Sequence, residues 1–345
     1  MSLLPFEKLR YLQNKKLLLA FSGGADSSAL FFTLIENSIP FDISIVHYGQ
    51  RTQADEEVRY AQDLAKKHKL QCHLLRTEKI EQNFEYEARQ IRYAFFEKLV
   101  NEHHYTHLLT AHHLQDRLEW MLMQLCKGAG SAELVGMREQ EPRPGYTLLR
   151  PLLGLSKEEI VSYLQSRNIK WFHDETNDDL SYKRNYFRHE ITTKLIQEYS
   201  AGIKQSFRYL EEDVQELIKD VQIHEAARMS LFFSTGHKRS DIFHVDKILK
   251  SKGYILTARQ REELKTRDEI IAGRRFLVVL DKGIYYIAPY VNDVMEKGFK
   301  EECRELGVPA KLRPYLFRKP VAFILFNRFL PCNINIHTPK EGKPS

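Results

Sequence analysis

The stretch LLLAFSGGADSS, residues 17–28, decides the fold and points to the chemistry of this chain. An apolar run ends at Ser22, the glycines Gly23 and Gly24 follow, and Asp26 lies where a helix-like segment begins. Adjacent glycines let the backbone turn sharply and approach a ligand closely. A helix that starts after such a turn presents free N–H groups and the positive end of its dipole. The order of strand, glycine turn and helix therefore predicts a phosphate-binding loop.

This loop differs from the two commonest nucleotide-binding loops. A Walker A loop carries a lysine after its last glycine and a dinucleotide fingerprint carries three spaced glycines, and neither pattern occurs here. Asp26 is informative for that reason, because a carboxylate beside phosphates is repelled unless a cation lies between them. We therefore expect Asp26 to face Mg²⁺ that is bound together with ATP. The alternative is a glycine turn that only joins a strand to a helix.

The pattern Ser-Gly-Gly-x-Asp-Ser resembles the pyrophosphate loop (PP-loop) of the N-type ATP pyrophosphatases. These enzymes split ATP between its α and β phosphates and adenylate an oxygen. The resemblance implies that the pyrophosphate is cradled by Ser22, Gly23, Gly24, Ala25, Asp26 and Ser27.

Size and composition limit the class of protein. A chain of 345 residues with 43% hydrophobic residues suggests two or three domains with packed cores. The net charge of +6 is compatible with a polyanionic partner but does not require one. No apolar run approaches the ~18–20 residues of a membrane helix, and no signal-peptide pattern opens the chain. The four cysteines form no Cys-x-x-Cys pair, which argues against zinc and iron–sulfur sites and favours a reducing cytoplasm.

Strand and helix patterns alternate through the first half of the chain. The strand patterns cover residues 16–21, 42–48, 71–76 and 107–111, and the helix patterns cover residues 27–37, 54–69, 84–101 and 114–127. Such alternation predicts an α/β fold with a doubly wound, mostly parallel sheet. Ligands bind such sheets at the carboxyl ends of the strands, and the glycine turn leaves the first strand at such an end.

The second half shows a different organisation. Residues 128–145 are rich in glycine and proline and predict loops, and residues 146–153 are extended again. Ser156 and Glu159 form a capping-box pattern that starts a helix. Further expectations are a bridging amphipathic helix at 203–221, a hairpin at 274–289, a strand pair at 321–336 and a frayed tail at 337–345. We therefore predict a catalytic domain at 1–195, a helical linker at 196–235 and a smaller α+β region at 236–345.

Two arginines follow the third predicted strand. A helix begins after Asn83, a residue type that caps helices, and Arg89 and Arg92 lie one turn apart on one side of it. Guanidinium groups near a phosphate loop would stabilise charge on an adenylate or on its leaving group. The alternative is an ordinary surface pair of Glu85 with Arg89. A further basic turn, at residues 47–51, ends the second strand.

Asp116 and Glu119 follow the fourth predicted strand, one helical turn apart. Such a pair could hold a metal, accept a proton or bind an ammonium group. The neighbouring His112 and His113 suggest zinc, but adjacent histidines cannot easily ligate one ion, so zinc is not favoured. The alternative for the two carboxylates is a helix cap with a solvated acidic face.

Basic and aromatic residues interleave at residues 182–188, where Arg184 and Arg188 alternate with tyrosine and phenylalanine. Basic side chains bind phosphates and aromatic rings stack on bases, so this segment suggests nucleic acid. The alternative is a helix start with ordinary surface charges.

The ordered set of clusters resembles the tRNA(Ile)-lysidine synthase family. No single segment is specific to the family, but the order in which the segments occur is specific. The matching segments are residues 22–27, 47–51, 83–93, 112–119, 127–130, 136–137, 150–153, 174–177 and 184–188. The resemblance implies that ATP adenylates the C2 oxygen of the wobble cytidine in tRNA(Ile) with a CAU anticodon. The ε-amine of free L-lysine then displaces AMP and forms lysidine, so the anticodon reads AUA instead of AUG.

The resemblance also implies roles for individual residues. The PP-loop holds pyrophosphate, with Asp26 toward Mg²⁺, and the two carboxylates suit the lysine ammonium, since only a neutral amine attacks. Arg184 and Arg188 would contact the nucleotide or the tRNA backbone, and the region after about residue 230 would contact tRNA. The implied catalytic residues are Asp26, Arg92 (with Arg89 assisting), Asp116 and Glu119.

The chain departs from the family pattern at Gln115, where an aspartate is common, and at Arg117 and Trp120. These departures alter the charge around the carboxylate pair. One rival is another PP-loop enzyme, such as a tRNA thiolase or an amidotransferase-like synthetase, but the missing cysteine pair and glutaminase segment count against it. A second rival is a nucleotide-binding module without catalysis, which leaves the carboxylates and paired arginines without a role. A homodimer is compatible with the family, although no residue here argues for it.

Overall fold

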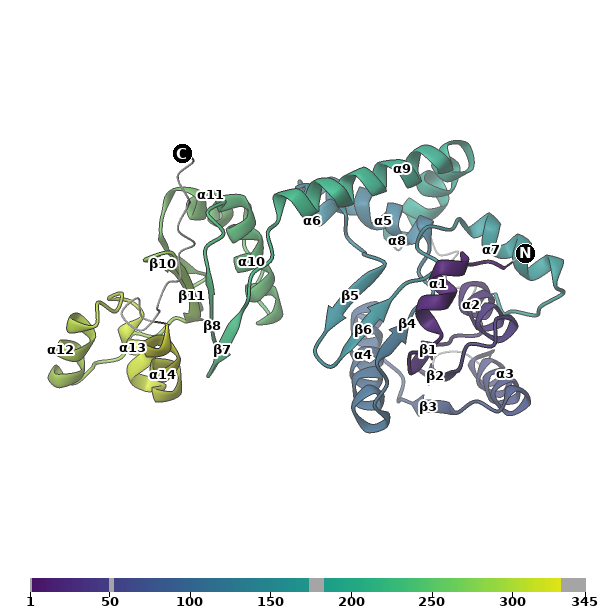
Figure 1. Ribbon diagram of the computed structural model, residues 1–345, viewed down its shortest axis with the longest axis horizontal. Coiled ribbons are helices and arrows are strands. Elements are labelled where there is room, and N and C mark those ends of the chain that lie inside the picture. The colour runs from purple at the N-terminus through teal and green to yellow at the C-terminus, as the bar shows by residue number, and fades with distance from the viewer. Residues whose placement is uncertain (1, 50–52, 174–182, 330–345) are drawn as a thin grey trace, which may run out of the picture. The chain divides into compact units, whose positions relative to one another are not determined.

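The computed structural model describes residues 2–49, 53–173 and 183–329 (Figure 1). It divides into two compact units, Met1–Glu211 and Glu212–Ser345, which are considered separately. Three expectations fall outside the described residues: the arginine of the basic turn at 47–51, the acidic segment 174–177 and the tail 337–345.

The first unit contains a six-stranded sheet in the order β3-β2-β1-β4-β6-β5. Its strands are β1 (Leu17–Ala20), β2 (Phe41–His47), β3 (Cys72–Arg76), β4 (His107–Leu109), β5 (Gln140–Arg143) and β6 (Tyr146–Leu149). All neighbours are parallel except β5 and β6. The chain crosses from β1 to β2 on one side and later returns to pair β4 on the other side. The direction of winding therefore reverses at β1, and a ligand crevice is expected outside its carboxyl end.

Helices cover both faces of this sheet (Figure 1). Leu17 and Leu19 belong to a core shared with α2 (Ala25–Glu36) and α3 (Gln53–His68), whereas Leu18 belongs to a core shared with α4 (Phe84–His103). Alternate side chains of one strand thus enter opposite layers, as a strand buried on both faces requires. The predicted doubly wound, mostly parallel α/β fold is confirmed.

Three more helices complete the apolar layers of this unit. Two of them, α1 (Phe6–Leu12) and α7 (Lys157–Ser166), join the α2 side. The third, α5 (Leu114–Leu125), packs through Leu118 against Phe207 of the long helix α9 (Thr193–Leu217). This helix begins ten residues before the predicted bridging helix, and it follows the short α8 (Lys183–Tyr186) and the π-helical segment η2 (Phe187–Thr192).

The interval predicted as loops, residues 128–145, is partly regular. It contains the one-turn helix α6 (Ser131–Leu134) and the edge strand β5, which pairs with β6 across a turn at Gly145 with φ 83°. Pro142 lies within β5, and an antiparallel edge strand is the position in a sheet where proline is tolerated. Proline and glycine here mark an edge hairpin and not an irregular loop.

The second unit is an antiparallel five-stranded sheet with helices, in the order β7-β8-β11-β10-β9. The strands are β7 (His224–Ala226), β8 (Met229–Phe233), β9 (Glu269–Ala272), β10 (Phe276–Asp281) and β11 (Ile284–Pro289). The helices α10 (Lys238–Ser251) and α11 (Ala258–Thr266) share one core with the sheet. The other core includes α12 (Lys297–Glu305), α13 (Arg313–Arg318) and α14 (Pro320–Arg328). The predicted hairpin at 274–289 and the α+β class are confirmed.

The strand pair predicted at residues 321–336 is wrong over its described part. Residues 320–328 form α14, with Pro320 at its first turn, where proline is favourable. Ala322 and Phe326, four residues apart, are buried, whereas Val321 and Ile324 are exposed. That spacing is helical, but a short continuous apolar run cannot be assigned to helix or strand from the sequence alone.

Candidate active site

The PP-loop lies where the topology predicts it, between the carboxyl end of β1 and the start of α2. Gly23 has φ 76°, a conformation that favours glycine, and Gly24 is the residue before the helix. Two backbone contacts to Phe172 fix the loop: Phe172 N donates to Gly23 O at 2.9 Å, and Gly24 forms a parallel bridge with Phe172. The turn is therefore held from outside by a segment about 150 residues further along the chain.

Serine hydroxyls organise the loop from inside. Ser27 Oγ accepts from Ser22 N at 3.2 Å and donates to Gly24 O at 3.2 Å, and Ser28 Oγ donates to Gly23 O at 3.3 Å. Gly24 precedes α2, which starts at Ala25, and as a glycine it has no side chain to cap the helix. Within the part of the chain that the structure describes, no side chain accepts from the N–H groups of residues 25–27, which suits an oxyanion site.

Asp26 lies in the first turn of α2 and is ion-paired. Its Oδ1 is 2.6 Å from Nζ of Lys157, and its Oδ2 is 3.7 Å from Nε2 of His113. Lys157 is the first residue of α7, which packs against α2. The carboxylate expected to face Mg²⁺ therefore has a lysine partner that the sequence interpretation did not include.

Asp116 and Glu119 are buried and close together in α5, with 7% and 1% of their surfaces exposed. Asp116 also closes a capping box, because its Oδ2 accepts from His113 N at 3.0 Å. The helix-cap part of the alternative is thus present, but the solvated acidic face is wrong, since both carboxylates are enclosed.

Arg184 and Arg188 pair with these two carboxylates. Arg184 reaches Asp116 Oδ1 through Nη2 at 2.6 Å and Glu119 Oε2 through Nε at 2.9 Å. Arg188 reaches Glu119 Oε1 through Nε at 2.7 Å. These four residues, called the charge cluster below, contain two positive and two negative groups and so are neutral together. The alternative, a helix start with ordinary surface charges, is wrong for both arginines, because each pairs with a buried carboxylate.

Within the charge cluster, the neighbouring charges shift the pKa values of Asp116 and Arg184. Burial alone would raise the pKa of Asp116, but its electrostatic interactions with His113 and Arg184 outweigh burial and hold that pKa far below its usual range. Burial would lower the pKa of Arg184, yet Asp116 and Glu119 raise it. Asp116 is therefore ionised at neutral pH, and Arg184 keeps its positive charge.

Two histidines lie beside the cluster and have different environments. Burial lowers the pKa of His112 to about 4, despite the opposing effect of Asp116, so its ring is neutral at pH 7. Gln115 Oε1 accepts from the backbone N of Lys157 at 3.0 Å and lies 3.0 Å from His113 Nδ1. A backbone N–H can only donate, so this oxygen is an acceptor and His113 Nδ1 carries a hydrogen. Nε2 of His113 is thereby directed to Asp26 and Asp116.

Arg89 and Arg92 contrast with the charge cluster, because both are exposed on α4. Arg89 lies 4.6 Å from the ring of Tyr93, and Arg92 influences the pKa of Tyr48. Among the described residues, no ion pair is found for either guanidinium. The alternative pair of Glu85 with Arg89 is wrong, since Glu85 lies 3.8 Å from Arg184.

The predicted asparagine cap of α4 is also wrong. Asn83 precedes the helix, but it adopts a left-handed conformation with φ 49° and makes no capping hydrogen bond through its side chain. A capping residue normally has extended backbone angles, which aim its side chain at the first turn.

The residues that depart from the family pattern have structural partners. Arg117 pairs with Glu211 at 2.6 Å and stacks 4.1 Å from the ring of Phe207. Trp120 covers Gly136, where an added Cβ would lie 2.1 Å from the indole. Both residues therefore pack α5 against its neighbours, and they do not add charge to the centre of the cluster.

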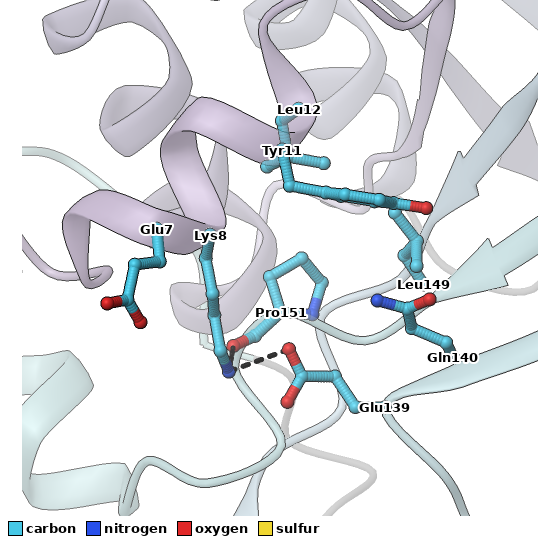
Figure 2. Close-up of a pocket in the computed structure, with 8 residues that line it drawn as sticks. All are labelled: Glu7, Lys8, Tyr11, Leu12, Glu139, Gln140, Leu149 and Pro151. Atoms are coloured by element: carbon cyan, nitrogen blue, oxygen red, sulfur yellow. Dashed lines mark hydrogen bonds and ion pairs between the residues drawn. The ribbon is translucent and has the colours of Figure 1, made fainter.

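A separate surface pocket of about 220 Å³ lies among α1, β5 and β6 (Figure 2). Lys8 reaches between Pro151 and Glu139 there, donating to Pro151 O at 3.3 Å and pairing with Glu139 at 2.8 Å. None of the predicted site residues lines this pocket. Lys8 and Glu139 pair with each other, and the pocket is therefore treated as separate from the candidate site.

The residues present fit a nucleotide and a divalent cation. The helix start after Gly24 and the positive φ of Gly23 suit phosphate oxygens, and the carboxylate of Asp26 is a ligand type that Mg²⁺ prefers. Over residues 2–49, 53–173 and 183–329, no group of three or more possible metal ligands comes together. A cation here would complete its shell with phosphate oxygens and water, as Mg²⁺ commonly does.

Comparison with known proteins supports this interpretation. A PP-loop domain family matches residues 4–195. A tRNA(Ile)-lysidine synthase from Helicobacter pylori is 41% identical over 312 residues, which cover 90% of this chain and 91% of the relative. Relatives of the same name from Campylobacter jejuni and Wolinella succinogenes are each 40% identical, over 91% and 92% of this chain and 96% and 97% of their own.

A solved structure agrees on the fold. The U34-tRNA thiolase NcsA from Methanococcus maripaludis aligns with a TM-score of 0.51 and 18% identity, over 62% of this chain and 79% of its own. No helix among the described residues is long and apolar enough to cross a membrane. The coverage and identity of the relatives, together with the PP-loop geometry, show that the chain belongs to the tRNA(Ile)-lysidine synthase family.

Proposed function

We propose that this chain ligates lysine to C2 of the wobble cytidine of tRNA(Ile) with a CAU anticodon, through an adenylated intermediate and with ATP converted to AMP and pyrophosphate. One observation in the structure supports this proposal independently of the name of the relatives. Nε2 of His113 lies 3.7 Å from Asp26 of the PP-loop and 3.5 Å from Asp116 of the buried carboxylate pair. A nucleotide site and an ammonium site separated by one side chain suit a reaction that joins an adenylate to an amine.

The first step is adenylation of the base. The C2 oxygen attacks the α-phosphorus, and pyrophosphate leaves. Ser22, Ser27 and the N–H groups at the start of α2 hold the departing pyrophosphate. Asp26 would hold Mg²⁺, which neutralises phosphate charge when bound. Arg92 and Arg89, exposed and without carboxylate partners in the described structure, are free to stabilise charge at the adenylate.

The second step is attack of the lysine ε-amine on C2, with AMP leaving. Asp116 and Glu119 attract the ammonium group, and a carboxylate accepts its proton before attack. The oxygens of both carboxylates already face Arg184 and Arg188. An arriving ammonium therefore replaces part of these ion pairs, and the released guanidinium groups are available to the adenylate phosphate or the tRNA backbone.

Charge distribution supports tRNA contacts in the second unit. Residues 1–211 contain 28 basic and 28 acidic residues, so the whole net charge of +6 comes from residues 212–345. Positive charge concentrated in one unit attracts a polyanion. A cytoplasmic location and a homodimeric state stay predictions.

The decisive experiment incubates the protein with ATP, unmodified tRNA(Ile) and labelled lysine. Label in the RNA supports lysidine formation, whereas ATP cleavage without label supports a thiolase-like rival, and no pyrophosphate release supports a binding module. An Asp116→Asn variant should lose lysine incorporation more than tRNA-dependent pyrophosphate release. Equal loss of both would remove the ammonium role from Asp116.

A further inference from the structure

Lys157 is a charged residue at the PP-loop to which the proposed mechanism gives no role. Its Nζ lies 2.6 Å from Asp26 Oδ1, and its side chain is 38% exposed. A cation at the first position of a helix is unfavourable to the helix dipole, so α7 gains nothing from it locally. A Walker A loop places a lysine within its own sequence to reach the β- and γ-phosphates, and this loop lacks one. Here α7 brings a lysine to the same kind of loop from elsewhere in the chain.

The backbone of Lys157 is held in place from two directions. Ser156 caps α7, since its Oγ accepts from Glu159 N at 3.3 Å. Gln115 of α5 accepts the N–H of Lys157 at 3.0 Å. The side chain beyond this fixed backbone is a flexible stem with an ammonium group, which can turn from one oxygen to another.

We propose that Lys157 is a phosphate-binding residue of the ATP site. In the nucleotide-free chain, the ammonium group of Lys157 pairs with Asp26. When ATP binds, this ammonium group pairs instead with a β- or γ-phosphate oxygen, and the carboxylate of Asp26 would hold Mg²⁺. The exchange keeps both charges paired, because Asp26 gains a cation as Lys157 gains an anion. This inference rests on the proposed function only in taking ATP as the ligand, and not on tRNA or lysine as substrates.

The experiment measures binding of a non-hydrolysable ATP analogue with Mg²⁺ by calorimetry, without tRNA or lysine. We expect Lys157→Met to weaken binding about 10- to 100-fold, the value of a hydrogen bond to a charged group. Lys157→Arg should recover most of the affinity. Because binding is measured alone, failure of lysine incorporation would leave this result intact, and the two proposals can fail separately.

The same substitution in a chain that already carries Asp26→Asn shows whether Lys157 binds phosphate or only neutralises Asp26. If Lys157 only balances that carboxylate, then Lys157→Met should cost nothing in an Asp26→Asn chain. If Lys157 binds phosphate, then Lys157→Met should still weaken binding about 10-fold there. Unchanged affinity in the Asp26→Asn background would overturn the proposal.

The matched control is Lys204→Met. Lys204 pairs with Glu159 at 2.8 Å near the same end of α7 and is 33% exposed, but no contact joins it to Asp26 in the described structure. Its loss should leave analogue affinity unchanged. Thermal unfolding of each variant checks folding, and Lys157→Gln replaces Lys157→Met in both backgrounds should the latter unfold at the assay temperature. An equal loss in Lys204→Met and Lys157→Met would also overturn the proposal.

Discussion

The PP-loop and the charge cluster lie side by side but are built in opposite ways. Within the loop, the hydrogen bonds of Ser27 and Ser28 join residues no more than five positions apart. In the cluster, Arg184 and Asp116 are 68 residues apart. The loop leaves helix N–H groups open for a ligand, whereas the cluster satisfies its charges internally. The first site is ready for an anion, and the second must exchange partners before a cation can enter.

The largest expected effect tests the internal pairing of the cluster. Glu119→Gln removes a buried negative charge and the 2.7 Å contact of Arg188 Nε with a carboxylate oxygen, so that within the charge cluster Asp116 alone faces both arginines and one positive charge is not balanced. We expect the free energy of unfolding to fall by about 3 kcal/mol, since breaking a buried pair leaves an uncompensated charge. Urea denaturation at pH 7.5 measures it.

Glu85→Gln provides the control for this variant. Glu85 lies 3.8 Å from Arg184, which also pairs with Glu119, but 69% of the Glu85 side chain is exposed. Its loss should cost less than about 1 kcal/mol, as for other exposed pairs. Similar losses of unfolding free energy in the two variants would mean that a buried ion pair of the charge cluster contributes no more to stability than an exposed one.

The same contrast explains what could be predicted from sequence. The PP-loop is predictable because its glycines, serines and Asp26 lie in one short segment between a strand and a helix. The capping box at Ser156 is predictable for the same reason. The burial of the carboxylates by Arg184 and Arg188 is not, because an ion pair between distant segments produces no periodicity or fixed spacing.

The role of Lys157 could not be predicted from sequence for the same reason. Its pairing with Asp26 spans 131 residues, and the sequence shows it only as one residue of a capping box. The helix at 320–328 and the edge strand β5 were missed for a different reason. Their local patterns fit more than one structure, and packing against the sheet decides between them.

The second prediction concerns the neutral histidine beside the cluster. The folded pKa of His112 is about 4, below the ordinary 6.5, so the unfolded chain binds its proton first as the pH falls. The stability from a neutral His112 is complete above pH 6.5 and is lost as the pH falls toward 4. We expect His112 to account for about 2 kcal/mol of the stability lost between pH 7.5 and pH 5.

Comparison with a variant isolates this contribution from the other histidines. In His112→Gln, the difference in unfolding free energy between pH 7.5 and pH 5 should be smaller than in the unmodified chain by about 2 kcal/mol. Denaturant titrations at both pH values measure the difference. An unchanged pH dependence would show that His112 is protonated in the folded chain as easily as in the unfolded one.

The third prediction tests the backbone geometry of the loop. Gly23→Ala places a Cβ at φ 76° and 3.4 Å from Phe172, so the cost is conformational more than steric. We expect a loss of about 1–2 kcal/mol, measured as lower unfolding free energy or as weaker binding of the ATP analogue. Gly154→Ala is the control, because its Cβ would meet nothing within 4 Å and its φ is ordinary. Equal costs at both positions would remove the special role of the turn.

The smallest expected effect concerns the cap of α7, the helix that carries Lys157 to the PP-loop. Ser156→Ala removes the capping hydrogen bond of α7 and should lower the unfolding free energy by about 1 kcal/mol. Analogue affinity should change little, because Gln115 still holds the N–H of Lys157. Thr257→Ala, in the equivalent capping box of α11, is the matched control: it should cost a similar amount and leave analogue affinity unchanged. A loss of affinity in Ser156→Ala as large as that in Lys157→Met would show that the start of α7, and not the ammonium group alone, determines phosphate binding.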